Sequence, residues 1–134
     1  MKRIFSFIAT YMACLWDGGW FQITSSESST SNGGDAYLVV ESSVLRLRFV
    51  CDRQQLFLDF QPAWADGTKW YSNDLVRRMF TGERERSAVL DESYAEFVCS
   101  KLAEIETRFA PSNWDETQAA LKTVQRKRDK ERFG

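Results

Sequence analysis

YLVVESSVLRLRFVCDRQQLFLDF, residues 37–60, contains three short apolar runs separated by two polar turns at nearly regular spacing. Apolar and polar residues alternate along the runs, which is the pattern of strands that bury one face. The stretch therefore predicts a three-strand antiparallel meander with turns at residues 42–43 and 52–53.

The second turn determines which side chains share a face of this meander. Pairing across residues 52–53 sets Phe49 opposite Leu56 on one face, and it pairs Arg46 with Asp59 on the other. The first face is wholly apolar and is expected to form the core: Ala36, Leu38, Val40, Leu45, Leu47, Phe49, Leu56, Leu58 and Phe60. The outer face is mixed, with Tyr37, Val39, Arg46, Arg48, Phe57 and Asp59.

The segments around the meander predict one more strand and four helices. Phe5, Ile8, Met12 and Leu15 form the apolar stripe of a first helix, which is expected to end near residues 18–19. A strand over residues 20–24, a flexible loop over 25–35 and a connection over 61–69 follow. The later helices are expected over residues 73–81, from a capping box at 93–96 to Pro111, and from 113 onward.

These elements predict an α+β fold, a four-strand antiparallel sheet packed against N-terminal and C-terminal helices. The 134 residues are interpreted as a single domain, residues 1–134, and residues 125–134 as a basic helix end or a frayed tail. A hydrophobic content of 43% is enough for a packed core, and a formal net charge of -1 gives no overall basic field for holding nucleic acid.

Three cysteines bear on the compartment in which the protein works. Cys14, Cys51 and Cys99 are odd in number and widely spaced, and the chain has no histidine. This pattern argues against zinc and against a disulfide framework, and it favours a reducing cytoplasm. Cys51 and Cys99 are expected to be small buried apolar residues, with a reactive thiol as the alternative.

The apolar N-terminal segment has two interpretations. Lys2 and Arg3 precede a run of apolar residues, as in a signal peptide, but the usual cleavage site with small residues is missing. We therefore favour a folded amphipathic helix. The run is too short to span a membrane, and no membrane association is expected.

Catalytic and metal-binding patterns are missing from the sequence. Without histidine, a hydrolase would need carboxylates or lysine as its base, and Asp52 and Asp59 are expected at opposite ends of one hairpin. No spacing typical of metal ligands or of a phosphate-binding loop is present. We therefore expect a protein that is not an enzyme, with no cofactor, no metal and no small-molecule substrate.

Several segments together resemble a known class of proteins. A short amphipathic helix, the strand opening Gly19-Trp20-Phe21, a glycine-containing loop, LRLRFVCDRQQLFLDF and WYSNDLVRRMFTG occur in this order over residues 1–82. This order resembles small immunity proteins encoded beside bacterial polymorphic toxins of the contact-dependent inhibition and Rhs systems. One position departs from that pattern, since Gln54 stands where such chains often have glycine.

The resemblance implies a protein that binds one cognate toxin domain and blocks it without turnover. The expected partner-binding residues lie on the outer face of the sheet and at its edges: Tyr37, Arg46, Arg48, Asp52, Arg53, Phe57, Asp59, Trp64 and Asp66. The alternative for this face is that a C-terminal helix packs on it and hides it.

Two other functions stay open at the level of sequence. A basic segment at residues 122–132 could bind nucleic acid or serve a regulatory role, although aromatic residues are not interleaved with its lysines and arginines. Nucleic acid is therefore not the expected partner. The third function is an adaptor of a secretion apparatus, which would bind an effector without inhibiting it. The oligomeric state does not follow from the sequence.

Overall fold

The computed structural model describes residues 1–18, 20–29 and 35–133 of the chain. The helices and strands are, in order, α1 (Lys2–Tyr11), α2 (Cys14–Asp17), β1 (Gln22–Ser28), β2 (Ala36–Glu41), β3 (Leu45–Asp52), β4 (Gln55–Pro62), β5 (Tyr71–Ser72), α3 (Asn73–Thr81), α4 (Glu92–Phe109) and α5 (Trp114–Phe133). The predicted α+β class is confirmed. The prediction of four strands is wrong, because the described residues form a sheet of five, in the order β1-β2-β3-β4-β5 with every neighbouring pair antiparallel.

The predicted faces of the meander are right, although the residue pairing predicted between its last two strands is wrong. Phe49 pairs with Leu58, and Arg48 rather than Arg46 pairs with Asp59, so β3 and β4 are displaced by two residues from the expected pairing. Since side chains alternate with a period of two, a shift of two residues leaves every side chain on its expected face. The turn lies at Arg53 and Gln54, whose φ angles are 50° and 69°. Positive φ at both positions is typical of a two-residue hairpin loop, and it is the conformation that glycine adopts most easily.

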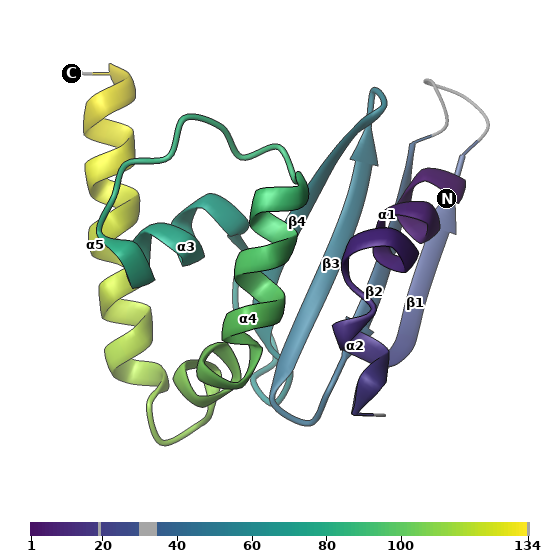
Figure 1. Cartoon of the computed structure of the whole chain (residues 1–134). Coiled ribbons are helices and arrows are strands. Elements are labelled where there is room, and N and C mark those ends of the chain that lie inside the picture. The colour runs from purple at the N-terminus through teal and green to yellow at the C-terminus, as the bar shows by residue number, and fades with distance from the viewer. Residues whose placement is uncertain (19, 30–34, 134) are drawn as a thin grey trace.

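The apolar face of the sheet is covered by helices at both ends of the sequence. Figure 1 shows α1, α2 and α4 on the same side of the sheet. The N-terminal stripe is Ile4, Ile8, Met12 and Leu15, all at most 1% exposed, whereas Phe5 is 45% exposed. The prediction that Phe5 begins the stripe is therefore wrong, because Ile8 and Ile4 are one helical turn apart and both face the sheet.

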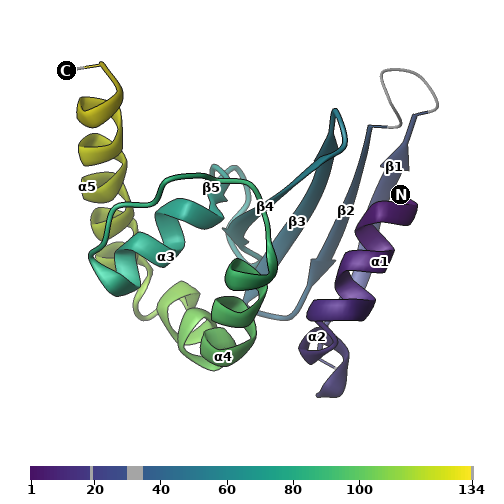
Figure 2. The same ribbon diagram turned by 45° about the horizontal axis from the view of Figure 1, so that its top comes forward.

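The remaining two helices lie beside the β5 edge of the sheet. Figure 2 shows α3 between α4 and α5, with α5 as the outermost element on that side. The bounds of α3 are those predicted, and Gly82 ends it with a φ of 76°. At the start of α4, the Asp91 side chain accepts a hydrogen bond from the Tyr94 backbone N–H, so the capping residue is Asp91 and not Ser93.

Strand β1 forms one edge of the sheet and extends further than predicted. It starts at Gln22 and runs to Ser28, so residues 25–28 of the expected loop are strand, held by pairing to β2 despite their polar sequence. Residues 30–34 of that loop lie outside the described residues. The register shifts between Ile23 and Ser25, which leaves Thr24 as a bulge, and all seven residues of β1 are exposed.

A disulfide contradicts the expectation for the cysteines. Cys14, at the start of α2, is bonded to Cys99 in α4, with Cα atoms 5.7 Å apart and a sequence separation of 85. Cys51 is a free thiol and is buried, as predicted. The disulfide connects the N-terminal helical segment to the helix that lies next to it on the apolar face of the sheet.

Among the described helices, none is both long enough and apolar enough to cross a bilayer.

Candidate functional site

The outer face of the sheet is the candidate site, because no described helix crosses it. In Figures 1 and 2, α1, α2 and α4 lie on the opposite face, and α3 and α5 lie beside the β5 edge. The alternative that a C-terminal helix packs on the outer face therefore does not hold. An open groove of about 750 Å³ lies there instead. Side chains and backbone of three strands and of the adjoining segments line it: Ser25, Glu27, Ser28, Ser29, Asp35, Ala36, Tyr37, Val39, Arg48, Val50, Cys51, Asp52 and Trp70.

Arg48 is the cation among the described residues that line this groove, and two neighbours hold it in place. Its Nη2 lies 2.8 Å from Asp59 Oδ2, and its Nε donates to the same oxygen. The guanidinium carbon lies 4.5 Å from the centre of the Trp70 ring, which is a cation–π contact. Arg48 is therefore positioned before any partner arrives, while about a third of its side chain stays exposed.

Asp59 is held in an environment that disfavours its charge. Burial raises the pKa of its carboxyl above the usual value, and the hydrogen bond and charge of Arg48 offset this only in part. The nearby carboxylate of Asp74 raises the pKa further. The ion pair with Arg48 therefore compensates only part of the cost of burying Asp59.

The raised pKa of Asp59 predicts how the stability depends on pH. The folded protein binds the proton of Asp59 more tightly than the unfolded chain does, so this group adds stability as the pH falls through its folded pKa, and the gain is lost as the pH rises again. Asp59→Asn has no carboxyl group at this position, so it cannot gain stability by binding this proton. The free energy of unfolding of the natural protein, minus that of Asp59→Asn, should therefore increase between pH 7 and pH 4 in urea titrations.

Asp52→Asn is the control for that measurement, because it removes the same charge from an exposed position on the neighbouring strand. If the difference between the natural protein and Asp59→Asn decreased on acidification, the pairing with Arg48 would outweigh burial, and the account of Asp59 would be wrong.

All three guanidinium nitrogens of Arg46 contact other groups of the same chain. Its Nε lies 2.6 Å from Glu41 Oε2, its Nη1 donates to Gln61 Oε1 at 2.7 Å, and its Nη2 donates to the carbonyl oxygen of Ala63. These bonds join β2, β3 and the end of β4. Arg46 is therefore better suited to fixing the sheet than to contacting a partner.

The other predicted residues divide between the two ends of the strands. Tyr37 and Asp52 line the groove, Phe57 is half-buried opposite Val50, and Arg53 is exposed in the hairpin turn. The backbone N–H of Arg53 donates to Asp35 Oδ1 at 3.1 Å, which connects the turn to the start of β2. These residues share the end of the sheet at which the groove opens.

Trp64 and Asp66 lie near the opposite end of the strands. They follow Pro62, which pairs with Leu45 at the start of β3, whereas Asp52 lies at the end of β3. The Trp64 Nε1–H donates to the carbonyl oxygen of Phe109 at 2.8 Å, so this ring is bound to the end of α4. The residues expected at the edges of the outer face therefore fall in two regions about 20 Å or more apart, at roughly 3.3 Å per strand residue.

The sequence did not single out Trp70 or Glu27 for this site. In the sequence, Trp70 begins the segment WYSNDLVRRMFTG, and Glu27 falls in the expected loop over residues 25–35. No local signal places Trp70 there, because its contact with Arg48 depends on how the connection after β4 returns to the sheet. Glu27 faces the groove because β1 is longer than its apolar residues indicate.

The groove combines an apolar centre with acidic edges. Tyr37, Val39, Val50 and Trp70 supply the apolar and aromatic surface, and carboxylates stand around it: Glu27, Asp35 and Asp52. Among the described residues, no three histidine, cysteine or carboxylate side chains come together in a way that could hold a metal ion. This surface can bury an apolar or aromatic side chain and pair with cations around it.

Comparisons with known proteins give no match: no family model, no curated protein and no solved structure is significantly similar to this chain.

Proposed function

We propose that the protein is an immunity protein, which binds a cognate bacterial toxin domain and neutralises it by tight, non-catalytic interaction in the cytoplasm. The proposal rests on the resemblance in element order and on one observation, the open groove on a sheet face that no described helix covers. A stable interface needs roughly 1,600 Å² of total buried surface. The outer face of a five-strand sheet offers a continuous surface for one partner.

The groove has the chemistry of an interface centre. Binding energy at interfaces is concentrated in aromatic residues and arginine that fill desolvated pockets. Tyr37, Arg48 and Trp70 are of these types, and Arg48 is held by Asp59 and Trp70 before binding. Little conformational entropy is then lost when a partner contacts it.

The edges of the groove indicate the charge of the partner. Glu27, Asp35 and Asp52 stand around the apolar centre, while the cation Arg48 is already paired with Asp59. Complementary charge speeds association and excludes wrong partners. The toxin surface that fits should therefore carry lysine or arginine around an apolar or aromatic side chain.

A protein that acts in the cytoplasm cannot depend on a disulfide for binding its partner. Thiols in the cytosol are generally kept reduced, so binding there must not require the bond between Cys14 and Cys99. The disulfide joins α2 to α4 on the covered face of the sheet, whereas the groove lies on the other face. The proposed interface can therefore form with the cysteines in either state.

The first experiment tests the function as a whole. The chain is co-expressed with the product of the reading frame immediately upstream, and rescue of growth and co-purification are both measured. Rescue together with co-purification is the expected result. Co-purification without rescue would indicate an adaptor, and the absence of both would remove the proposal.

A second experiment tests whether the outer face of the sheet binds the toxin. Arg48→Ala should weaken toxin binding by about 30-fold or more in a calorimetric titration, which is the loss of about 2 kcal/mol that defines an interface hot spot. Lys101→Ala is the matched control, because Lys101 is an exposed cation on α4, away from the groove. It should leave the affinity unchanged.

The thermal stability of Arg48→Ala must be measured alongside, since the substitution leaves Asp59 buried without its cation. Tyr37→Ala is a second variant that breaks no ion pair. A lower melting temperature with unchanged affinity in both variants would mean that these side chains only hold the sheet together.

A further inference from the structure

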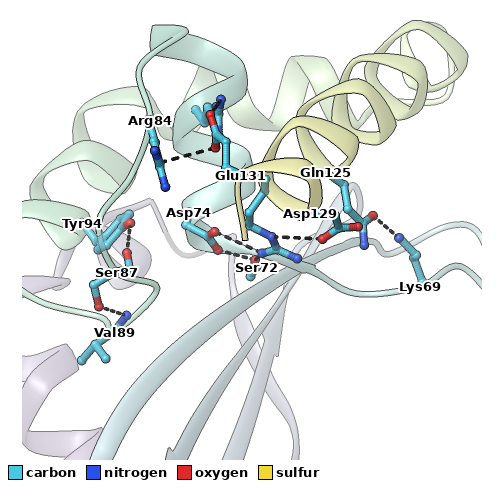
Figure 3. A network of polar contacts seen from close by, with 12 residues as sticks. Lys69, Ser72, Asp74, Arg84, Ser87, Val89, Tyr94, Gln125, Asp129 and Glu131 are labelled. Carbon is cyan, nitrogen blue, oxygen red and sulfur yellow. Dashed lines mark hydrogen bonds and ion pairs between the residues drawn. The ribbon is translucent and has the colours of Figure 1, made fainter. Parts of the chain in front are cut away.

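A second, more enclosed pocket lies between α3, the segment that follows it and α5. Its volume is about 240 Å³. Five arginines from these three parts of the chain line it, together with three carboxylates: Arg78, Arg84, Arg86, Arg128, Arg132, Asp74, Glu85 and Glu131. Figure 3 shows Asp74, Arg84 and Glu131 converging there from α3, the following segment and α5.

The carboxylates in this pocket do not neutralise its arginines. Glu131 pairs with two of them, since it accepts hydrogen bonds from Arg78 at 2.8 and 3.0 Å and lies 3.5 Å from Arg84 Nε. Asp74 pairs with Arg128 at 3.1 Å.

Glu85 pairs with Arg77, which is not part of the lining. Within the described part of the chain, no ion pair of Arg86 or Arg132 is found. Like charges around one pocket repel one another unless an anion stands among them.

One of the arginines that line the pocket also has a buried donor without a partner. The Nε of Arg128 is buried without a hydrogen bond, and the carboxylate oxygen of Asp129 is 4.0 Å away, too far for one. Buried donors are nearly always paired in folded proteins, so an orphaned guanidinium N–H beside a cationic pocket indicates a missing acceptor. Guanidinium groups match the oxygens of phosphate and carboxylate in geometry and in charge.

We propose that this pocket binds an oxyanion with two or more negative charges, carried either by phosphate groups or by a pair of carboxylates. The exposed Arg84, Arg86 and Arg132 would contact it, while Arg78 and Arg128 form the inner wall. The pocket shares no residue with the groove on the sheet, so this inference stands independently of the proposed toxin binding.

The test uses the protein alone, with three probes at matched ionic strength: sodium pyrophosphate, sodium glutarate and sodium chloride. A bound anion raises the melting temperature, because it stabilises only the folded state. At millimolar concentration, pyrophosphate or glutarate should raise it by about 3 °C or more above chloride. A larger effect of pyrophosphate identifies a phosphate ligand, and a larger effect of glutarate identifies a carboxylate ligand.

Two double variants locate the effect. Arg86→Gln/Arg132→Gln should weaken the anion affinity at least about 10-fold in calorimetry, the result of losing two charge-assisted contacts. Lys101→Gln/Lys122→Gln removes the same charge from exposed residues outside the pocket and should bind normally. Equal melting temperatures in all three salts, or equal losses in both double variants, would overturn the proposal. Since all four positions are exposed, both variants should fold, and their melting temperatures in chloride verify this.

Discussion

Replacing Cys14 and Cys99 together by serine should lower the free energy of unfolding of the oxidised protein by about 4 to 5 kcal/mol. The bond closes a loop with a sequence separation of 85 residues. In the chain-entropy model, a cross-link over a loop of this size removes conformational freedom worth roughly that amount from the unfolded chain. The loss is comparable to a large part of the total stability of a small domain.

Urea unfolding of the natural protein, with and without dithiothreitol, provides the comparison. The reduced natural protein and the double serine variant should unfold at similar urea concentrations, both well below the oxidised protein. The variant itself should be insensitive to dithiothreitol. An unchanged midpoint for the natural protein on complete reduction, verified by thiol titration, would contradict the prediction.

Phe109→Ala should cost about 3 to 5 kcal/mol, the usual range for removing a phenylalanine ring from a core. Phe109 is fully buried at the end of α4. Its ring centre lies 6.2 Å from that of Phe60 on β4 and 5.2 Å from that of Trp114 at the start of α5. The ring therefore joins the sheet to two helices, and its removal leaves a cavity where three elements meet.

Phe5→Ala is the matched control, because the same atoms are removed from a side chain that is 45% exposed. It should change the stability by about 0.5 kcal/mol or less. Similar losses in the two variants would mean that the N-terminal helix depends on Phe5, against the burial pattern described for it. Chemical denaturation of both variants under one condition is sufficient.

The sequence predicted the two faces of the central strands because alternation is a local property. Leu47 and Phe49 had to lie on one side and Arg48 on the other, whatever the pairing of the strands. The register itself depends on the turn, and Arg53-Gln54 carries no signal for positive φ such as Asn-Gly would give. The prediction therefore placed the turn one residue too early and displaced the pairing by two.

Other features depend on contacts between distant residues. Strand β5 has two residues, which is too short to show any alternation. The disulfide joins cysteines that are 85 positions apart, and no spacing rule connects such a pair. The burial of Ser42 is also non-local, since its hydroxyl donates to Glu106 on α4 at 3.0 Å.

The candidate site was predictable in its centre and not at its boundary. Tyr37, Arg48 and Asp59 follow from alternation along the strands, and the structure places all three on the outer face. Trp70 could not be assigned, because its contact with Arg48 depends on how the connection after β4 returns to the sheet. Trp64 stands in that same connection but contacts Phe109 instead.

The exposed strand β1 has a consequence for aggregation. A free strand edge can template pairing with another chain, and natural sheets block this with charges, bulges or very short edge strands. Here one edge carries a bulge at Thr24 and the charged Glu27 in an otherwise mostly polar strand, and the other edge is a strand of two residues. Both edges of the sheet thus discourage the strand-by-strand pairing between chains that leads to fibrils.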